Sequence, residues 1–214
     1  MYKESLHDWF GFVVVSMLVT LSPGPGVIMA LSNSLSHGPR RAMLGSLGNA
    51  FGLLVVSTAT SAGLGVLLQS SATAFLLLKV LGASYLIYLG IKQWKSRSSA
   101  FDQLEQPAKA IASNRRLLLN GVTVALTNPK AILFFAAFLP QFMRTGHGAE
   151  GQLALLVVTF ALCSMLSHAF YVTLAQALKN QLAAPSRARL MNRLFGVSFM
   201  TLGASLFTVQ AKTA

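Results

Sequence analysis

The chain has 214 residues, of which 54% are hydrophobic and only 10% charged, and its mean hydropathy is +0.60. Soluble domains carry about 25% charged residues, so this composition excludes an ordinary soluble protein and indicates a membrane protein. A net charge of +12 would favour nucleic acid as a partner of a soluble protein. In a membrane protein it indicates basic loops on one side of the bilayer, and no nucleic acid is expected.

Six apolar stretches are long enough to cross a bilayer, which takes about 20 residues. In chain order they are residues 9–35, 42–68, 74–94, 117–142, 152–178 and 191–209. The first ten residues hold Glu4 and Asp8 instead of a basic signal region, so the first span is expected to be retained. The sequence therefore predicts an all-α polytopic membrane protein with six transmembrane helices.

The polar segment 96–116 is the longest loop, and it divides the chain into two three-helix units, 1–95 and 117–214. Twelve Lys and Arg residues lie in or beside this linker, the loop after the first span and the loop before the sixth, against four on the opposite side. Basic residues collect on the cytoplasmic side, so we expect these loops in the cytoplasm and both chain ends in the periplasm. The same loops can contact anionic lipid headgroups.

Two pairs of similar stretches suggest that the second three-helix unit repeats the first. Because each unit has an odd number of spans, the second unit would enter the membrane in the opposite orientation. With an offset of 106 residues, Ser22 and Pro23 align with Asn128 and Pro129. With an offset of 114 residues, Gly82, Ser84 and Tyr85 align with Gly196, Ser198 and Phe199. The sequence predicts a 3+3 inverted repeat, although chance similarity between apolar stretches is an alternative.

The aligned prolines lie near the centres of the first and fourth spans. Proline donates no backbone hydrogen bond, while Ser and Asn are preferred helix N-caps and Pro is favoured at the first helical position. We therefore expect both helices to stop and restart at these pairs. The restarted halves would direct free N–H groups and positive dipole ends at one place, as in transporters with a midplane site. The alternative is a pair of packing kinks. The candidate substrate-binding residues at the breaks are Ser22, Pro23, Gly24, Pro25, Gly26, Asn128 and Pro129.

The prolines also free carbonyl groups one turn earlier in each helix. Pro23, Pro25 and Pro129 cannot donate to the carbonyls of Val19, Leu21 and Ala125. Those oxygens are expected to face a ligand or water.

Lys130 follows the second break, some 12 or 13 residues from either end of its span. A charge at the centre of a span costs roughly 2.5–3.5 kcal/mol on insertion, which makes such a residue a functional candidate. We predict that Lys130 binds an anionic group such as a substrate carboxylate. A structural lysine bonded to the freed carbonyls is the alternative, and the two roles are compatible.

The fifth span carries a polar stripe of Ser164, His168 and Tyr171, spaced to lie on one helix face. His168 is the one histidine inside a span and is the candidate for proton coupling, with a purely structural hydrogen-bonding role as the alternative. Asn49 in the second span adds a polar candidate, and Gly48 with Gly52 predicts close helix packing. The spans hold no Asp or Glu, so neither a metal site nor a cofactor is expected.

Three stretches resemble the LysE family of bacterial amino-acid exporters: "LSPGPGVIMALSNSLSHGPRRAMLGSLGNAFG", "LKVLGASYLIYLGIKQW" and "LTNPKAILFFAAFLPQF". The similarity is greatest to its homoserine, homoserine-lactone and threonine exporting branch, and "YVTLAQAL" and "LFGVSFMTLGASLF" extend it. The resemblance implies a proton-driven inner-membrane exporter of small amino acids, whose motif residues are Pro23, Gly24, Pro25, Asn128, Pro129 and Lys130. Related exporters often carry an acid near Ser164, and its absence here leaves His168 as the titratable candidate.

Three classes of function remain open from the sequence. Secondary export of homoserine, homoserine lactone, threonine or a similar compound is the leading prediction. A passive channel or metal-ion carrier of the same fold is the alternative, with the missing acids against a metal. An intramembrane enzyme is disfavoured because no Gly-x-Ser-x-Gly motif is present. The oligomeric state stays open, with a homodimer among the alternatives.

Overall fold

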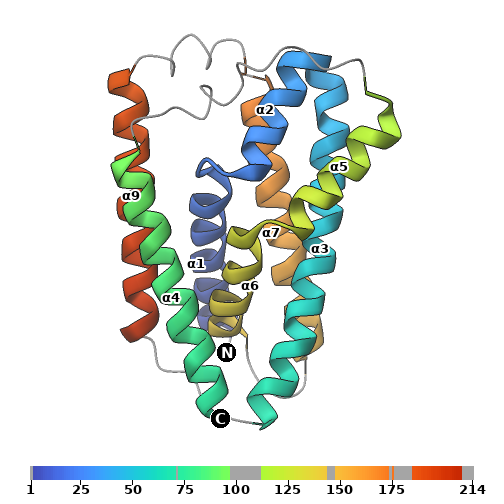
Figure 1. Ribbon diagram of the computed structural model, residues 1–214. Helices are drawn as coiled ribbons and strands as arrows, with labels where there is room; N and C mark the ends of the chain where they lie inside the picture. The colour runs from blue at the N-terminus through green and yellow to red at the C-terminus, as the bar shows by residue number, and fades with distance from the viewer. Residues whose placement is uncertain are drawn as a thin grey trace.

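The computed structural model describes residues 2–70, 72–96, 112–143, 148–173, 175 and 185–208, and these residues form helices joined by short connections (Figure 1). The helices are α1 (Tyr2–Leu21), α2 (Pro25–His37), α3 (Pro39–Ser70), α4 (Ala72–Lys95), α5 (Asn114–Leu126), α6 (Pro129–Phe142), α7 (Ala149–Thr173) and α9 (Pro185–Thr208). No strand occurs among the residues described. Most of the predicted linker, residues 97–111, and the last residues of the predicted fifth and sixth spans lie outside the described residues.

The predicted interruptions are bends in the structure. The segments α1 and α2 meet at an angle of 56°, and α5 and α6 meet at 51°. Three helices, α3, α7 and most of α9, are each long and apolar enough to cross a membrane. Each of the two bent pairs also qualifies if it is counted as one span, which gives three to five candidate spans. The helix α4 corresponds to the predicted span 74–94 but is not among these five. The part of the chain that the structure describes is thus all-helical, as expected for a polytopic membrane protein, while the count of six spans stays a prediction.

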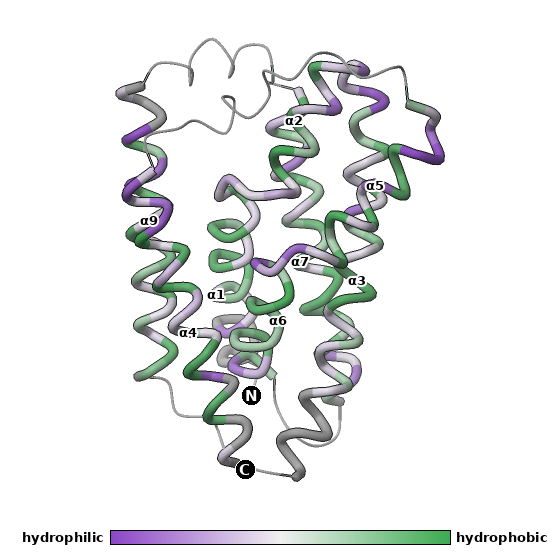
Figure 2. The backbone as a smooth tube through the Cα atoms, in the orientation of Figure 1, coloured by the Kyte–Doolittle hydropathy of each residue, from purple (hydrophilic) through white to green (hydrophobic). Residues whose placement is uncertain are grey.

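The helices alternate in direction along the molecule (Figure 1). The C-terminal ends of α2, α4 and α7 lie toward the same end of the molecule as the starts of α3, α5 and α9. The start of α1 and the end of α9 lie toward the other end. Strongly hydrophilic residues lie at the first end, including the start of α5, and another hydrophilic stretch lies at the start of α6 (Figure 2). The described helix ends that flank the three segments predicted to be cytoplasmic therefore lie at one end of the molecule.

Glycines allow two pairs of helices to approach closely. In the α3–α5 pair, a Cβ added to Gly48 would overlap the Leu118 carbonyl oxygen, and one added to Gly52 would lie 2.6 Å from the Ala125 Cβ. The packing role predicted for Gly48 and Gly52 is thus confirmed. In the α4–α9 pair, a Cβ at Gly90 would lie 2.7 Å from the Gly196 carbonyl oxygen. Backbones this close leave no room for a side chain between them.

Aromatic packing anchors the helix that carries Lys130. Phe134, one turn after Lys130 in α6, is fully buried, and its ring stacks on Phe160 of α7 with 4.9 Å between centroids. Phe12 of α1 lies 6.3 Å from the Phe134 ring. These rings form the centre of the main hydrophobic core. The start of α6 is therefore held against α1 and α7 by apolar contacts, which positions the polar residues beside it.

Candidate functional site

The two breaks meet in the middle of the molecule, where the end of α1 lies beside the start of α6 (Figure 1). At the second break the prediction from sequence is confirmed. Asn128 is the N-cap of α6, its side-chain oxygen accepts from the Lys130 backbone N–H at 3.1 Å, and Pro129 occupies the first turn.

At the first break the predicted cap is wrong by two residues. Gly24, in an extended conformation, is the N-cap of α2, and Pro25 begins the helix, whereas Ser22 and Pro23 lie in the break. The Ser22 hydroxyl instead accepts a hydrogen bond from the Lys130 ammonium at 3.1 Å. Both Pro23 and Pro25 suit the first turn of a helix, so the local sequence allowed two restarts.

The side chain of Lys130 begins at the second break, and its ammonium group reaches the first. Its Nζ donates to the carbonyl oxygens of Val19 and Ser22, both at 3.0 Å, and to the Ser22 hydroxyl. An ammonium has three N–H groups, so these three oxygens can satisfy all of them. Pro23 leaves the Val19 carbonyl without a backbone donor, and this oxygen accepts from Lys130 in place of the expected ligand or water. In this structure Lys130 thus fills the structural role that the sequence offered as an alternative.

The other two freed carbonyls have different partners. The Leu21 carbonyl, expected to face a ligand or water, instead accepts the Tyr171 hydroxyl of α7 at 2.7 Å. The Ala125 carbonyl, expected to face a ligand, instead accepts the Asn128 backbone N–H at 3.3 Å in a local turn. Side chains of α6 and α7 therefore hydrogen-bond to the carbonyls of the first break. At the second break, the freed carbonyl is bonded within the local turn.

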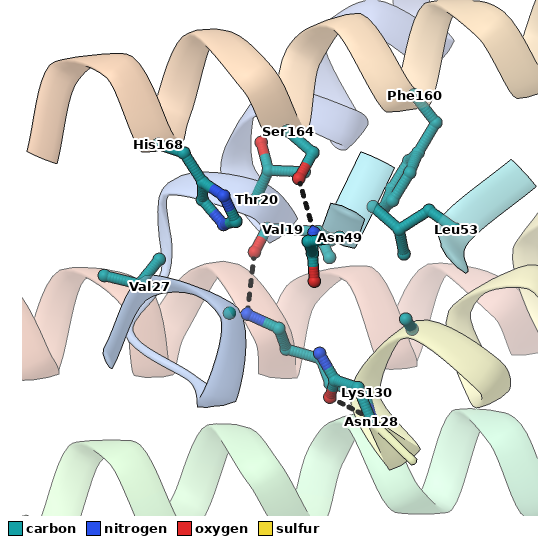
Figure 3. A pocket seen from close by; sticks show the side chains of 12 residues that line it. Val19, Thr20, Val27, Asn49, Leu53, Asn128, Lys130, Phe160, Ser164 and His168 are labelled. Atoms are coloured by element: carbon teal, nitrogen blue, oxygen red, sulfur yellow. Dashed lines mark hydrogen bonds between the residues drawn. The ribbon is translucent and has the colours of Figure 1, made fainter. Parts of the chain in front are cut away.

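A small cavity of about 30 Å³ lies beside the ammonium (Figure 3). Asn49 of α3 donates to the Ser164 hydroxyl of α7 at 3.3 Å, and His168 lies one turn further along α7, only 3% exposed. A Cβ added to Gly26 would lie 3.1 Å from His168 Nε2, so this glycine lets α2 approach the imidazole. The cavity has room for one or two water molecules and polar groups to bind them.

A second cavity of about 350 Å³, which we call the vestibule, lies on the other side of the breaks. Lys130 and Asn128 line both cavities. The vestibule also includes Lys92 and Ser96 at the C-terminal end of α4, the end predicted to be cytoplasmic. Its volume falls in the range of small-molecule sites, roughly 300–1,000 Å³. Lys130 therefore stands between a water-sized cavity and one that can hold a small molecule.

Comparison with known proteins places these features in a family. Residues 17–210 match the model of the LysE type translocators. This chain belongs to the LysE family. It is 38% identical to a homoserine/homoserine lactone efflux protein of Salmonella typhimurium over 92% of this chain and 95% of the relative. It is 30% identical to a leucine efflux protein of Klebsiella pneumoniae over 95% and 96%. It is also 33% identical to an uncharacterized membrane protein of Vibrio cholerae over 96% and 99%. No solved structure matches significantly.

The family assignment confirms the resemblance drawn from the motifs, and the matched region of this LysE protein contains both breaks. The family and the named efflux relatives are transport proteins, which favours transport over catalysis. Six of the twelve predicted site residues line the small cavity: Gly26, Asn49, Asn128, Lys130, Ser164 and His168. The vestibule is lined by Pro23, Gly24, Pro25, Asn128, Pro129 and Lys130. Ser22 and Tyr171 line neither cavity but make hydrogen bonds to the break and to Lys130 described above.

The structure adds residues to the site of this LysE protein that the predicted set omitted. Val19 and Thr20 line the small cavity, and Tyr85, Gln93 and Phe199 line the vestibule. The loss of the proline N–H pointed to the Val19 carbonyl, and the alignment of the two halves paired Tyr85 with Phe199. No sequence signal singled out Gln93, because a polar residue near a helix end is common.

Proposed function

We propose that this LysE protein is a secondary exporter of small amino acids or their derivatives, such as homoserine, homoserine lactone or threonine. The observation that carries the proposal is the Lys130 ammonium held at the meeting of two helix breaks, facing a cavity of about 350 Å³. The names of the efflux relatives support amino acids as the class of substrate. The absence of Asp and Glu from the predicted spans leaves this region positively charged, which suits a carboxylate.

A carboxylate entering the vestibule would compete with the oxygens that now bind Lys130. Hydrogen bonds between an ammonium and a carboxylate are about twice as strong as those to neutral oxygens. Loading would therefore draw Lys130 away from Val19 and Ser22 and release the bond that joins the two breaks. A lactone would offer the same ammonium a carbonyl oxygen. In this proposal substrate binding and the geometry of the break are coupled through one side chain.

The proposed binding residues are the predicted set: Ser22, Pro23, Gly24, Pro25, Gly26, Asn49, Asn128, Pro129, Lys130, Ser164, His168 and Tyr171. The two cavities and the hydrogen bonds of the first break support this set. A Cβ at Gly24 would lie 3.0 Å from Lys130 Nζ, so the glycine keeps the ammonium open to the vestibule.

We propose a 3+3 inverted repeat in the bacterial inner membrane, with units 1–95 and 117–214, a cytoplasmic linker 96–116 and periplasmic ends. Bends of 56° and 51° at aligned positions support the repeat. The alternating helix directions support six crossings (Figure 1). The vestibule would then open toward the cytoplasm, as expected for a site that loads from inside.

Single cysteines test this topology. In a Cys163→Ser background, Ser36→Cys at the end of α2 and Glu150→Cys at the start of α7 place exposed thiols at opposite ends of the molecule. An impermeant thiol reagent should label Glu150→Cys in intact cells and Ser36→Cys only after permeabilisation. Labelling of Ser36→Cys from outside would overturn the orientation.

We further propose that His168 carries the coupling proton, because histidine changes charge near physiological pH and this one borders the cavity next to Lys130. Proteoliposomes containing the wild-type protein should exchange homoserine or threonine downhill and accumulate it when a proton gradient is imposed. The His168→Gln variant should keep downhill exchange and lose accumulation, whereas His37→Gln, outside both cavities, should behave as wild type.

Two results would contradict these proposals separately. A wild-type protein that moves no amino acid in either direction would remove the exporter function. Full gradient-driven accumulation by His168→Gln would leave the exporter function intact and make His168 a structural hydrogen-bonding residue.

A further inference from the structure

The wall of the vestibule that faces the breaks comes from α4 and α9. Phe199 of α9 lies close to the ammonium, with 5.9 Å between Lys130 Nζ and the ring centroid. This distance is within the reach of a cation–π contact. Tyr85 of α4 lines the same cavity. The group held by Lys130 would therefore lie within reach of an aromatic wall.

The volumes of the two cavities decide where the body of a substrate can lie. The small cavity, at about 30 Å³, accepts water and is too small for an amino-acid side chain. The vestibule, at about 350 Å³, is more than ten times larger. With its carboxylate on Lys130, an amino acid must therefore extend its side chain into the vestibule toward α4 and α9.

We propose that Tyr85 and Phe199 form the side-chain subsite of this transporter and determine which amino acids it carries. The inference rests on the proposed function, in which Lys130 binds the carboxylate. Phe199 supplies an apolar face whose bulk limits the length of the side chain. Tyr85 supplies a hydroxyl that can hydrogen-bond to a hydroxyl group on the substrate, so the preferred class is small, hydroxyl-bearing amino acids.

The alignment of the two halves supports this pairing independently of the cavity. In sequence, Tyr85 aligns with Phe199 at the offset of 114 residues and Pro23 aligns with Pro129 at the offset of 106, although in the structure α2 begins at Pro25. All four residues line the vestibule. In the proposed repeat, both halves would thus contribute aligned residues to the cavity. The Tyr85 hydroxyl makes its member of the aromatic pair polar, whereas Phe199 is apolar.

Tyr85→Phe tests the polar side, because it removes the hydroxyl and keeps the ring. Threonine and valine have nearly the same shape and differ by a hydroxyl against a methyl group. In proteoliposomes, the ratio of threonine to valine transport should fall about three- to tenfold, the range of one net hydrogen bond. The control is Tyr88→Phe, the same change one turn later in α4 on a residue that is 56% exposed. It should leave the ratio unchanged.

Phe199→Ala tests the apolar side. The shortened residue should admit longer side chains, and the ratio of leucine to threonine transport should rise about tenfold or more, as expected for a changed apolar pocket. The control is Phe207→Ala, the same change in α9 on a residue that is 53% exposed. Because Phe199 is buried, Phe199→Leu is a milder second variant, and it should shift the ratio in the same direction by a smaller factor.

The outcomes separate this inference from the proposed function. If the wild-type protein transports amino acids but Tyr85→Phe and a folded Phe199 variant keep both ratios unchanged, the aromatic subsite is wrong and the exporter function stands. If the wild-type protein transports no amino acid, both are wrong. If the exposed controls Tyr88→Phe and Phe207→Ala change the ratios equally, the effect is not specific to the vestibule and the subsite is again overturned.

Discussion

Lys130→Ala should reduce transport about thirtyfold or more, to the level of empty vesicles. Removing one partner of a buried, hydrogen-bonded charge pair costs about 2 kcal/mol or more, and tenfold corresponds to about 1.4 kcal/mol. Lys130→Arg should rescue poorly, because a planar guanidinium cannot replace a compact ammonium among three oxygens. The measurement is counterflow of homoserine or threonine in proteoliposomes, normalised to the amount of folded protein.

The control for this prediction is Lys79→Ala, the same change in α4 at a residue outside both cavities. Lys130→Ala should still insert into the membrane, because it removes a charge that is costly to bury. If Lys130 were only a structural clamp between the breaks, its alanine variant would lower thermal stability and leave transport per folded molecule unchanged. That result would refute its role in binding substrate.

Gly48→Ala and Gly63→Ala, two identical changes in α3, should alter stability in opposite directions. A Cβ at Gly48 would overlap the backbone oxygen of Leu118, so α3 and α5 would have to separate. Overpacking of this kind costs about 1–3 kcal/mol. Gly63 has no neighbouring atom within 4 Å of an added Cβ, and alanine there should stabilise the helix by about 0.4–1 kcal/mol.

Unfolding in detergent, followed by thermal scans or denaturant titration, measures both glycine effects. The added Cβ meets backbone at Gly48, and backbone cannot move aside as the end of a flexible side chain can. Equal stability of the two variants would mean that α3 and α5 do not pack through this glycine. Gly121→Ala tests the same α3–α5 contact from the α5 side, because its Cβ would overlap the Gly45 carbonyl oxygen.

The sequence predicted the two breaks correctly because their cause is local. A proline lacks the N–H for the preceding turn wherever it occurs in a helix, and a cap residue before proline favours a restart. This reasoning located the second break to the residue, with Asn128 as the cap. It failed by two residues at the first break, where Pro23 and Pro25 are both suitable starts and the helix begins at Pro25. The Ser22 hydroxyl was then available to Lys130.

The sequence by itself determined that Lys130 needs a partner at membrane depth, since a charge in an apolar segment is costly wherever the segment packs. Only the tertiary structure decided that the partners are Val19 and Ser22, more than a hundred residues earlier in the chain. The same holds for Tyr171 and the Leu21 carbonyl. The division between the small cavity and the vestibule also depends on how α4 and α9 pack against the breaks. Hydrogen-bonding capacity is a property of each residue, but the choice of partner and the shape of the space left over are set by contacts between helices that no local pattern records.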